Sequence, residues 1–139
     1  MIDKLKKIDL PNLEVTSVDK TCYGYVVNAD FKRYSDACPR CKSGDLVDYG
    51  LSWERLAHTP FCGRKTIIEV SKHRRLCKDC GLVHNPKPTI KYKNYRITDD
   101  LAHYIFGQVQ IGRTNVSIAK EVGIDNKTVA KVVKDVLDD

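Results

Sequence analysis

The sequence predicts an α+β fold in which the strands come first and the helices last, and three observations predict it. Residues 13–29 alternate apolar and polar side chains around a short polar turn, which is typical of a β-hairpin. Two Cys-x-x-Cys pairs follow, at residues 38–41 and 77–80. From residue 98 onward, apolar residues repeat at every third or fourth position, which indicates helices.

Length and charge narrow the class of protein. The chain has 139 residues, of which 42% are hydrophobic, enough for two small domains. No apolar run approaches the roughly 20 residues that span a bilayer, and Met1–Lys7 lacks the apolar core of a signal peptide. We therefore expect a cytoplasmic protein with no membrane partner. The net charge of +6 favours a polyanionic partner, which would make the protein nucleoid-associated.

The first segment is predicted as a β-hairpin. Leu13–Val18 forms one strand, Asp19–Thr21 the turn, and Tyr23–Ala29 the return strand, which is rich in aromatic and β-branched residues. Cys22 lies near the turn, away from any second cysteine, and is expected to be a bystander thiol.

The two cysteine pairs are predicted to bind metal. They supply the four thiolates of a tetrahedral structural zinc site: Cys38, Cys41, Cys77 and Cys80. The prediction is one structural Zn²⁺, and the alternative is two disulfides or buried thiols. Because four thiolates complete a site, the other candidate ligands are expected not to bind it: Cys62, His58, His73 and His84. Among them, His84 is the residue expected to replace a cysteine ligand if one is displaced.

Between the cysteine pairs, residues 46–50 and 66–70 are predicted as short strands, the second continuing to Leu76. Trp53 falls in the loop between them, beside Arg55, where it would either stack on a base or pack in the core. A domain this small buries little apolar area, so zinc binding is expected to contribute much of its folding free energy.

Basic residues concentrate in two segments. The predicted strand carries Lys72, Arg74 and Arg75, and alternation places Lys72 and Arg74 on one face, which would follow a phosphate backbone or remain solvated. Residues 85–97 contain two prolines and four cations with no acid, so they are predicted to form a basic linker that contacts DNA as an extended arm. Its cations are Lys87, Lys91, Lys93 and Arg96.

The C-terminal segment is predicted as a helix-turn-helix domain. Thr98 caps the first helix, a second helix ends at Gly123, and Asp125 or Asn126 caps the third. Two helices that cross closely need a small residue at the contact, a glycine at the turn and apolar residues facing the core. The sequence supplies these with Ala119, Gly123, Ile124 and Val129. A plain three-helix bundle is the alternative.

The outer face of the third helix is the predicted DNA-reading surface. Its residues are Asn126, Lys127, Ala130, Lys131 and Lys134. Asn126 and Lys127 would contact bases, because an amide bonds adenine and an ammonium reaches guanine acceptors, while Lys131 and Lys134 would contact phosphates. The predicted domains are therefore a hairpin and zinc ribbon at 1–84, a basic linker at 85–97, and a helix-turn-helix domain at 98–139.

The order of these motifs resembles a known family. It runs from the hairpin through Cys-Pro-x-Cys, Tyr49-Gly50, Arg55, Pro60, Gly63-Arg64 and Arg74-Arg75-x-Cys-x-x-Cys-Gly to the helix-turn-helix. This order is similar to the N-terminal region of the ISL-three family of bacterial insertion-sequence transposases. The resemblance implies that the four cysteines bind zinc, that the helix from Asn126 reads DNA, and that both modules recognise the terminal inverted repeats of the element.

The chain departs from that family at its end. It stops at Asp139, where the family continues into a catalytic domain of the DDE type, whose three carboxylates hold two metal ions. We therefore expect a chain that binds double-stranded DNA without cutting it, with no catalytic residues and no small-molecule substrate; a homodimer is left open. The alternatives are a stand-alone regulator, a protein-interaction module and, least favoured, an enzyme using Cys62 or the histidines.

Overall fold

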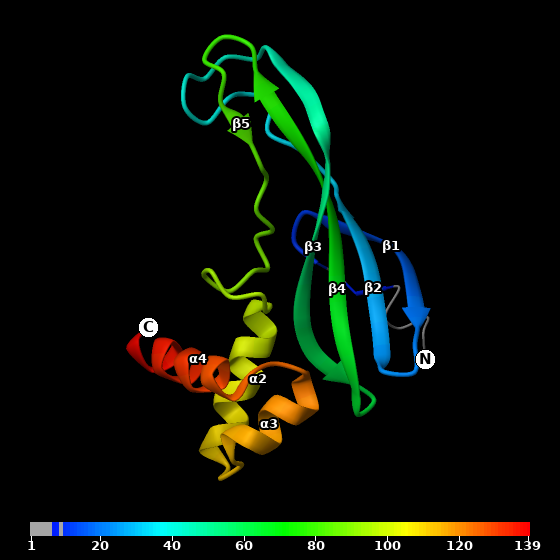
Figure 1. The fold of residues 1–139 in the computed structure, drawn as a ribbon, viewed down its shortest axis with the longest axis vertical. Helices are drawn as coiled ribbons and strands as arrows, with labels where there is room; N and C mark the ends of the chain where they lie inside the picture. The colour runs from blue at the N-terminus through cyan, green and yellow to red at the C-terminus, as the bar shows by residue number, and fades with distance from the viewer. Residues whose placement is uncertain (1–6, 9) are drawn as a thin grey trace.

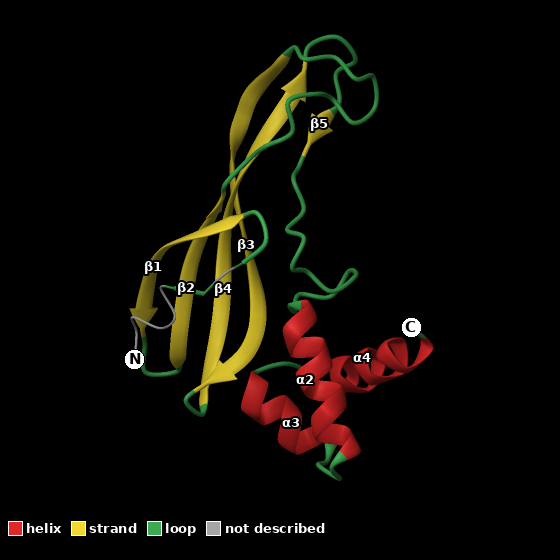
Figure 2. Cartoon of the chain, turned by 180° about the vertical axis from the view of Figure 1, so that it is seen from behind, coloured by secondary structure: helices red, strands yellow, loops and turns green. Residues whose placement is uncertain are grey.

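The computed structural model describes residues 7–8 and 10–139, and it combines an elongated sheet with three helices at one end (Figures 1 and 2). The predicted α+β class, with strands first, a four-cysteine cluster and helices last, is confirmed. The expectation about a signal peptide rested on residues 1–7, and all of these except Lys7 lie outside the described residues.

The first two strands form the predicted hairpin. β1 (Leu13–Lys20) pairs antiparallel with β2 (Gly24–Phe31), and the amide of Thr21 donates to the carbonyl of Gly24 at 2.7 Å to close the turn. Gly24 lies where β2 begins to run beside β4, and a Cβ there would lie 2.0 Å from the carbonyl oxygen of Lys65. Only glycine allows this approach.

The next two strands form a much longer hairpin than the sequence predicts. β3 (Leu46–Phe61) pairs antiparallel with β4 (Arg64–Cys77) along most of its length. Trp53 was predicted in a loop, but it lies within β3 opposite Ser71. It does not pack in the core either, since 61% of the residue is exposed.

The sheet order is β1-β2-β4-β3, so β3 is an edge strand. β2 runs parallel to β4 and pairs with residues 65–71 of it. Farther along, β5 (Val83–His84) pairs with Arg75 and Leu76 of β4. The cysteine end of the long hairpin therefore extends beyond the four-strand part of the sheet, as Figure 1 shows.

The helices begin and end where local signals predict. The hydroxyl of Thr98 accepts from the amide of Leu101 to cap α2 (Asp99–Gln110), and Thr114 caps α3 (Asn115–Val122) in the same way. Gly123 ends α3 with φ of 82°, and Asp125 caps α4 (Asn126–Asp138). No helix in the described part of the chain is both long enough and apolar enough to cross a membrane.

Two hydrophobic cores hold the molecule together. The sheet core gathers buried residues of β1, β2, β3 and β4, and the helix core gathers buried residues of α2, α3 and α4. The segment predicted as a linker joins both, because Ile90 belongs to the sheet core while Tyr92 and Ile97 belong to the helix core. Leu137, near the end of α4, is 67% exposed and lies outside both cores.

Candidate metal centre

The second cysteine pair lies in a tight turn at the end of β4. The amide of Gly81 donates to the carbonyl of Cys77 at 2.8 Å, and the amide of Cys77 donates to the carbonyl of Leu82 at 2.9 Å. Gly81 has φ of 74°, a left-handed conformation that suits glycine. These bonds curl the chain so that both thiols point to one side.

The first cysteine pair repeats the same construction. The amide of Lys42 donates to the carbonyl of Cys38 at 2.9 Å, and the amide of Cys38 donates to the carbonyl of Ser43 at 2.8 Å. Lys42 occupies the position equivalent to Gly81 and also has a positive φ, of 65°. The two turns are therefore matched halves of one site.

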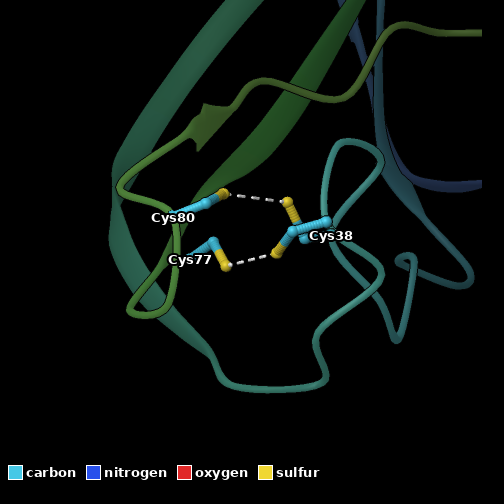
Figure 3. Close-up of side chains that lie close together, drawn as sticks. Cys38, Cys77 and Cys80 are labelled. Carbon is cyan, nitrogen blue, oxygen red and sulfur yellow. Dashed lines mark hydrogen bonds between the residues drawn. The ribbon is translucent and has the colours of Figure 1, made fainter.

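The four sulfurs meet between the two turns (Figure 3). Cys38 Sγ lies 3.5 Å from Cys80 Sγ, and Cys41 Sγ lies 3.5 Å from Cys77 Sγ. All four ligand atoms lie within 4.8 Å of one another. Tetrahedral zinc with Zn–S bonds of about 2.3 Å separates its sulfurs by roughly 3.8 Å. The four thiols therefore fit one structural Zn²⁺, and a complete thiolate set leaves no ligand position for a substrate.

The backbone of the turns favours thiolates. A backbone hydrogen bond from Leu82 lowers the pKa of Cys80 to about 6, and one from Cys41 lowers the pKa of Cys38. At Cys41 a backbone hydrogen bond from Ser43 acts in the same direction, but neighbouring thiols, Cys77 first, raise its pKa to about 12. Four adjacent thiolates repel one another without a cation, so a dication suits this donor set.

Further hydrogen bonds, from side chains and backbone, join the two turns outside the sulfurs. Arg40 Nη2 donates to the carbonyl of Cys80 at 2.7 Å, and the amide of Lys78 donates to the carbonyl of Asp45 at 3.0 Å. The hydroxyl of Ser43 bonds to the carboxylate of Asp79. These contacts orient the turns toward each other and support the metal ligands.

The other cysteines and histidines lie outside this site. Cys22 lies at the β1–β2 turn and Cys62 at the β3–β4 turn, while His58 bonds the Thr98 hydroxyl at 2.8 Å. His84 lies in β5. Among the described residues, the structure gathers one group of three or more potential metal ligands, and that group is the four cysteines.

Two lysines that were predicted to contact phosphates are paired with a carboxylate of the protein itself. Lys72 was expected on an exposed face, but it is only 7% exposed and its Nζ lies 2.9 Å from Glu54 Oε2. Lys91 binds the other oxygen of the same carboxylate at 2.5 Å. The prediction that Lys72 is exposed is therefore wrong. Pairing of β3 with β4 brings the Glu54 carboxylate beside it, which the local sequence pattern does not reveal.

The rest of the predicted linker is fixed to the end of α4. Tyr95 donates to the Asp135 carboxylate at 2.5 Å, Tyr92 donates to Asp139 at 2.9 Å, and Lys93 Nζ lies 3.0 Å from Asp139. The aromatic rings of Tyr92 and Tyr95 stack with centroids 6.1 Å apart. This segment therefore holds α4 in place and is not a free arm.

The remaining predicted contacts differ in accessibility. Arg74 lies over the ring of Tyr49 and Arg75 over the ring of Tyr34, both in the narrow part of the sheet near the cysteines. Lys87 and Arg96 are exposed, with no ion pair to any described acid. The predicted residues of α4 are also exposed: Asn126, Lys127, Ala130, Lys131 and Lys134.

Glu54 gives a testable consequence of the shared ion pair. We expect Glu54→Gln to lower the free energy of unfolding by about 3 kcal/mol at neutral pH, because two largely buried lysines lose their counterion. Burial alone would raise the pKa of Glu54, but hydrogen bonds from Lys91 and Lys72 hold it below its ordinary value. Its stabilisation is therefore present above the unfolded pKa of about 4.3 and is lost as the pH falls through the lower folded pKa.

Urea unfolding from neutral pH into this acid range, with zinc present, measures the effect as the difference between wild type and variant. That difference should shrink as the acid protonates Glu54 in the wild type. The matched control is Glu69→Gln, whose partner Arg55 has a 68% exposed side chain, and it should cost only about 0.5 kcal/mol. Two outcomes would contradict the proposed role of Glu54: equal losses of unfolding free energy in the two variants, or a difference between wild type and Glu54→Gln that does not change with pH.

Together these features define a zinc-ribbon domain, with four cysteines on two matched turns at the end of a long β-hairpin. Residues 35–80 match the family model of the zinc-finger of transposase IS204/IS1001/IS1096/IS1165, which confirms the predicted similarity to ISL3-family transposases for this segment. No curated protein and no solved structure matches the chain. The family match indicates a nucleic-acid-binding role connected with transposition.

Proposed function

We propose that this chain recognises double-stranded DNA at the terminal inverted repeats of a transposable element. The observation that carries the proposal is the outer face of α4, where an amide and three lysines are exposed together on a helix whose opposite side is buried. Val129 and Val132 on that opposite side are 0% exposed. The match of residues 35–80 to a transposase zinc-finger supports the same biological setting.

The geometry of α3 and α4 supports a helix-turn-helix arrangement. Only residues 123–125 separate the two helices, and Gly123 in the left-handed conformation turns the chain sharply between them. Ala119 is 4% exposed in the helix core, and Ile124 packs against that core. In such an arrangement the N-terminal part of the second helix enters the major groove.

Asn126 and Lys127 occupy this N-terminal part of α4. An asparagine amide pairs with the N6 and N7 positions of adenine, and a lysine ammonium reaches the O6 and N7 acceptors of guanine. Lys131 and Lys134 follow one and two turns later, where phosphates flank the groove. No ion pair to a described acid neutralises any of the three lysines.

We further propose that these residues bind DNA without cutting it, the zinc ribbon supporting the reading helix through the sheet. α3 contacts both β3 and β4, and the Ala57 amide donates to the Arg96 carbonyl at 2.9 Å. The long hairpin is thus continuous from the metal to the helices. A strand-cleavage assay with Mg²⁺ or Mn²⁺ should leave the bound duplex intact.

Selection of bound duplexes from a random library tests the proposal. We expect one enriched sequence, bound at least about a thousandfold more tightly than scrambled duplex, and an affinity that falls steeply with salt. Repeating the selection after zinc chelation separates the two modules, since retained specificity would assign base readout to the helices. Equal affinity for selected and scrambled duplexes would overturn the proposal.

A further inference from the structure

A basic cleft of about 610 Å³ lies between the edge strand β3 and the segment that follows β5. Figure 1 shows that segment running beside the sheet from β5 to α2. The lining comes from β3, β4 and residues 85–96, and its charged and aromatic residues are Trp53, Glu54, Arg55, Lys72, Lys87, Lys91 and Arg96. The cleft takes no part in the metal site and lies apart from the outer face of α4.

Both sides of the cleft are anchored. At one end β5 pairs with β4, and at the other Ala57 of β3 bonds to the backbone of Arg96 and Thr98. Between these ends Ile90 is buried in the sheet core. The segment therefore forms one wall of the cleft, held to the sheet at both ends and by the Lys91–Glu54 ion pair between them.

The charged side chains of the cleft fall into two groups, one paired with an acid and one exposed without such a pair. Five cations and one carboxylate line it, and Glu54 is already bound by Lys72 and Lys91. Lys87 and Arg96 are exposed and have no ion pair with a described acid. Because positive charge remains after the internal pairs are made, the cleft suits an anion such as a phosphodiester.

Trp53 adds an aromatic surface to this basic cleft. Its residue is 61% exposed, and the neighbouring side chain of Arg55, bound to Glu69 at 3.0 Å, is 68% exposed. Flat aromatic surfaces beside cations bind unpaired bases by stacking, which a base inside a duplex cannot offer. A cavity of this volume is also within the range of small-ligand sites and suits one or two nucleotides.

We propose that this cleft binds an unpaired stretch of single-stranded DNA, with Trp53 stacking on a base and Lys87 and Arg96 contacting its phosphates. A second hollow, of about 410 Å³, shares Arg55 and Arg96 with the cleft and reaches Gly123 at the start of the α3–α4 turn. Tyr23, 82% exposed, lies on this path. The path would carry a strand from a duplex at α4 to Trp53; that placement rests on the proposed function, whereas strand binding in the cleft does not.

The test uses Trp53 itself, which is the only tryptophan in the chain. Intrinsic fluorescence of the zinc-loaded protein is titrated at low ionic strength with an oligothymidylate of about ten nucleotides, within the site sizes of known single-strand binders. The single strand should quench the indole, and a duplex of equal length should quench it far less. Absence of quenching, or equal quenching by the duplex, would overturn the proposal.

Variants measured by anisotropy of a labelled oligothymidylate locate the site. Trp53→Ala should weaken binding about tenfold. Lys87→Ala with Arg96→Ala should weaken it about tenfold or more, although the Arg96 carbonyl keeps its bond to the Ala57 amide. The matched control, Lys20→Ala with Lys32→Ala, removes the same charge from exposed positions on β1 and just after β2, outside the cleft lining, and should leave strand affinity nearly unchanged.

Equal loss in the cleft variant and the control at Lys20 and Lys32 would overturn the cleft as the site, because charge alone would then explain binding. The duplex selection tests the proposed function separately. A protein that fails to select a duplex but loses strand binding only with the cleft variants would refute the proposed function and support this inference.

Discussion

Removal of zinc should unfold the cysteine end of the long hairpin while the rest of the protein stays folded. The sheet core contains no residue between 32 and 55 or between 71 and 89, so little buried apolar area stabilises the metal end. Structural zinc in small fingers contributes about 10 kcal/mol or more of apparent binding free energy. That contribution replaces a core at this end, and its loss should therefore be local.

Amide hydrogen exchange before and after chelation measures this directly. The amides of Cys38, Lys42, Cys77 and Gly81, which form the bonds of the two turns, should lose their protection. Amides of β2 and of the middle of β4, such as those of Val27 and Ile68, should keep it, because these residues are fully buried in the sheet core.

Cys77→Ser should reproduce chelation in the presence of zinc, since one lost thiolate opens the site. Cys22→Ser is the matched control, because Cys22 is exposed at the β1–β2 turn and lies outside the four-cysteine group. Turn amides that stay protected without metal would show that the backbone and side-chain contacts suffice. Global unfolding would instead show that the sheet core depends on the metal.

Much of the fold could be predicted because its signals are local. The hairpin follows from alternation, the metal site from the cysteine spacing, and the helix boundaries from Thr98, Gly123 and Asp125. Each of these signals lies within a few residues of the feature that it specifies. The four ligands needed one further assumption, that two identical turns face each other, and the structure confirms that they do.

The long strands could not be predicted because their pairing is not local. Residues 51–61 of β3 mix polar, aromatic and charged side chains and become a strand by pairing with β4. The parallel pairing of β2 with β4 likewise joins segments about forty residues apart in the sequence. Trp53 was placed in a loop for this reason.

The ion pairs of the basic residues could not be predicted for a related reason. A count of cations along residues 85–97 cannot reveal the carboxylates of Glu54 and Asp139, which come from distant elements and pair with Lys91 and Lys93. Two prolines suggested an open linker, but Ile90, Tyr92 and Ile97 are buried and fix it. Those three apolar residues were the sequence signal that the segment packs against the protein, since a solvated arm would expose them to water.

Substitutions on α4 should separate base reading from phosphate binding. Asn126→Ala should cost about 2 kcal/mol against the preferred duplex and relax specificity at one base position, because an amide that reads adenine is lost. Lys131→Ala should weaken all duplexes alike and reduce the slope of log affinity against log salt by about 1, since one phosphate contact is lost. Fluorescence anisotropy with the selected duplex and its single-base variants, at several salt concentrations, measures both effects.

The matched control for charge is Lys20→Ala on β1, at the edge of the sheet opposite β3. It removes one exposed cation without touching the helices, so neither specificity nor the salt slope should change appreciably. If Lys20→Ala and Lys131→Ala had the same effect, duplex binding would depend on net charge and not on α4. If Asn126→Ala weakened every duplex equally, the start of α4 would lie on the phosphates, and another surface would have to read the bases.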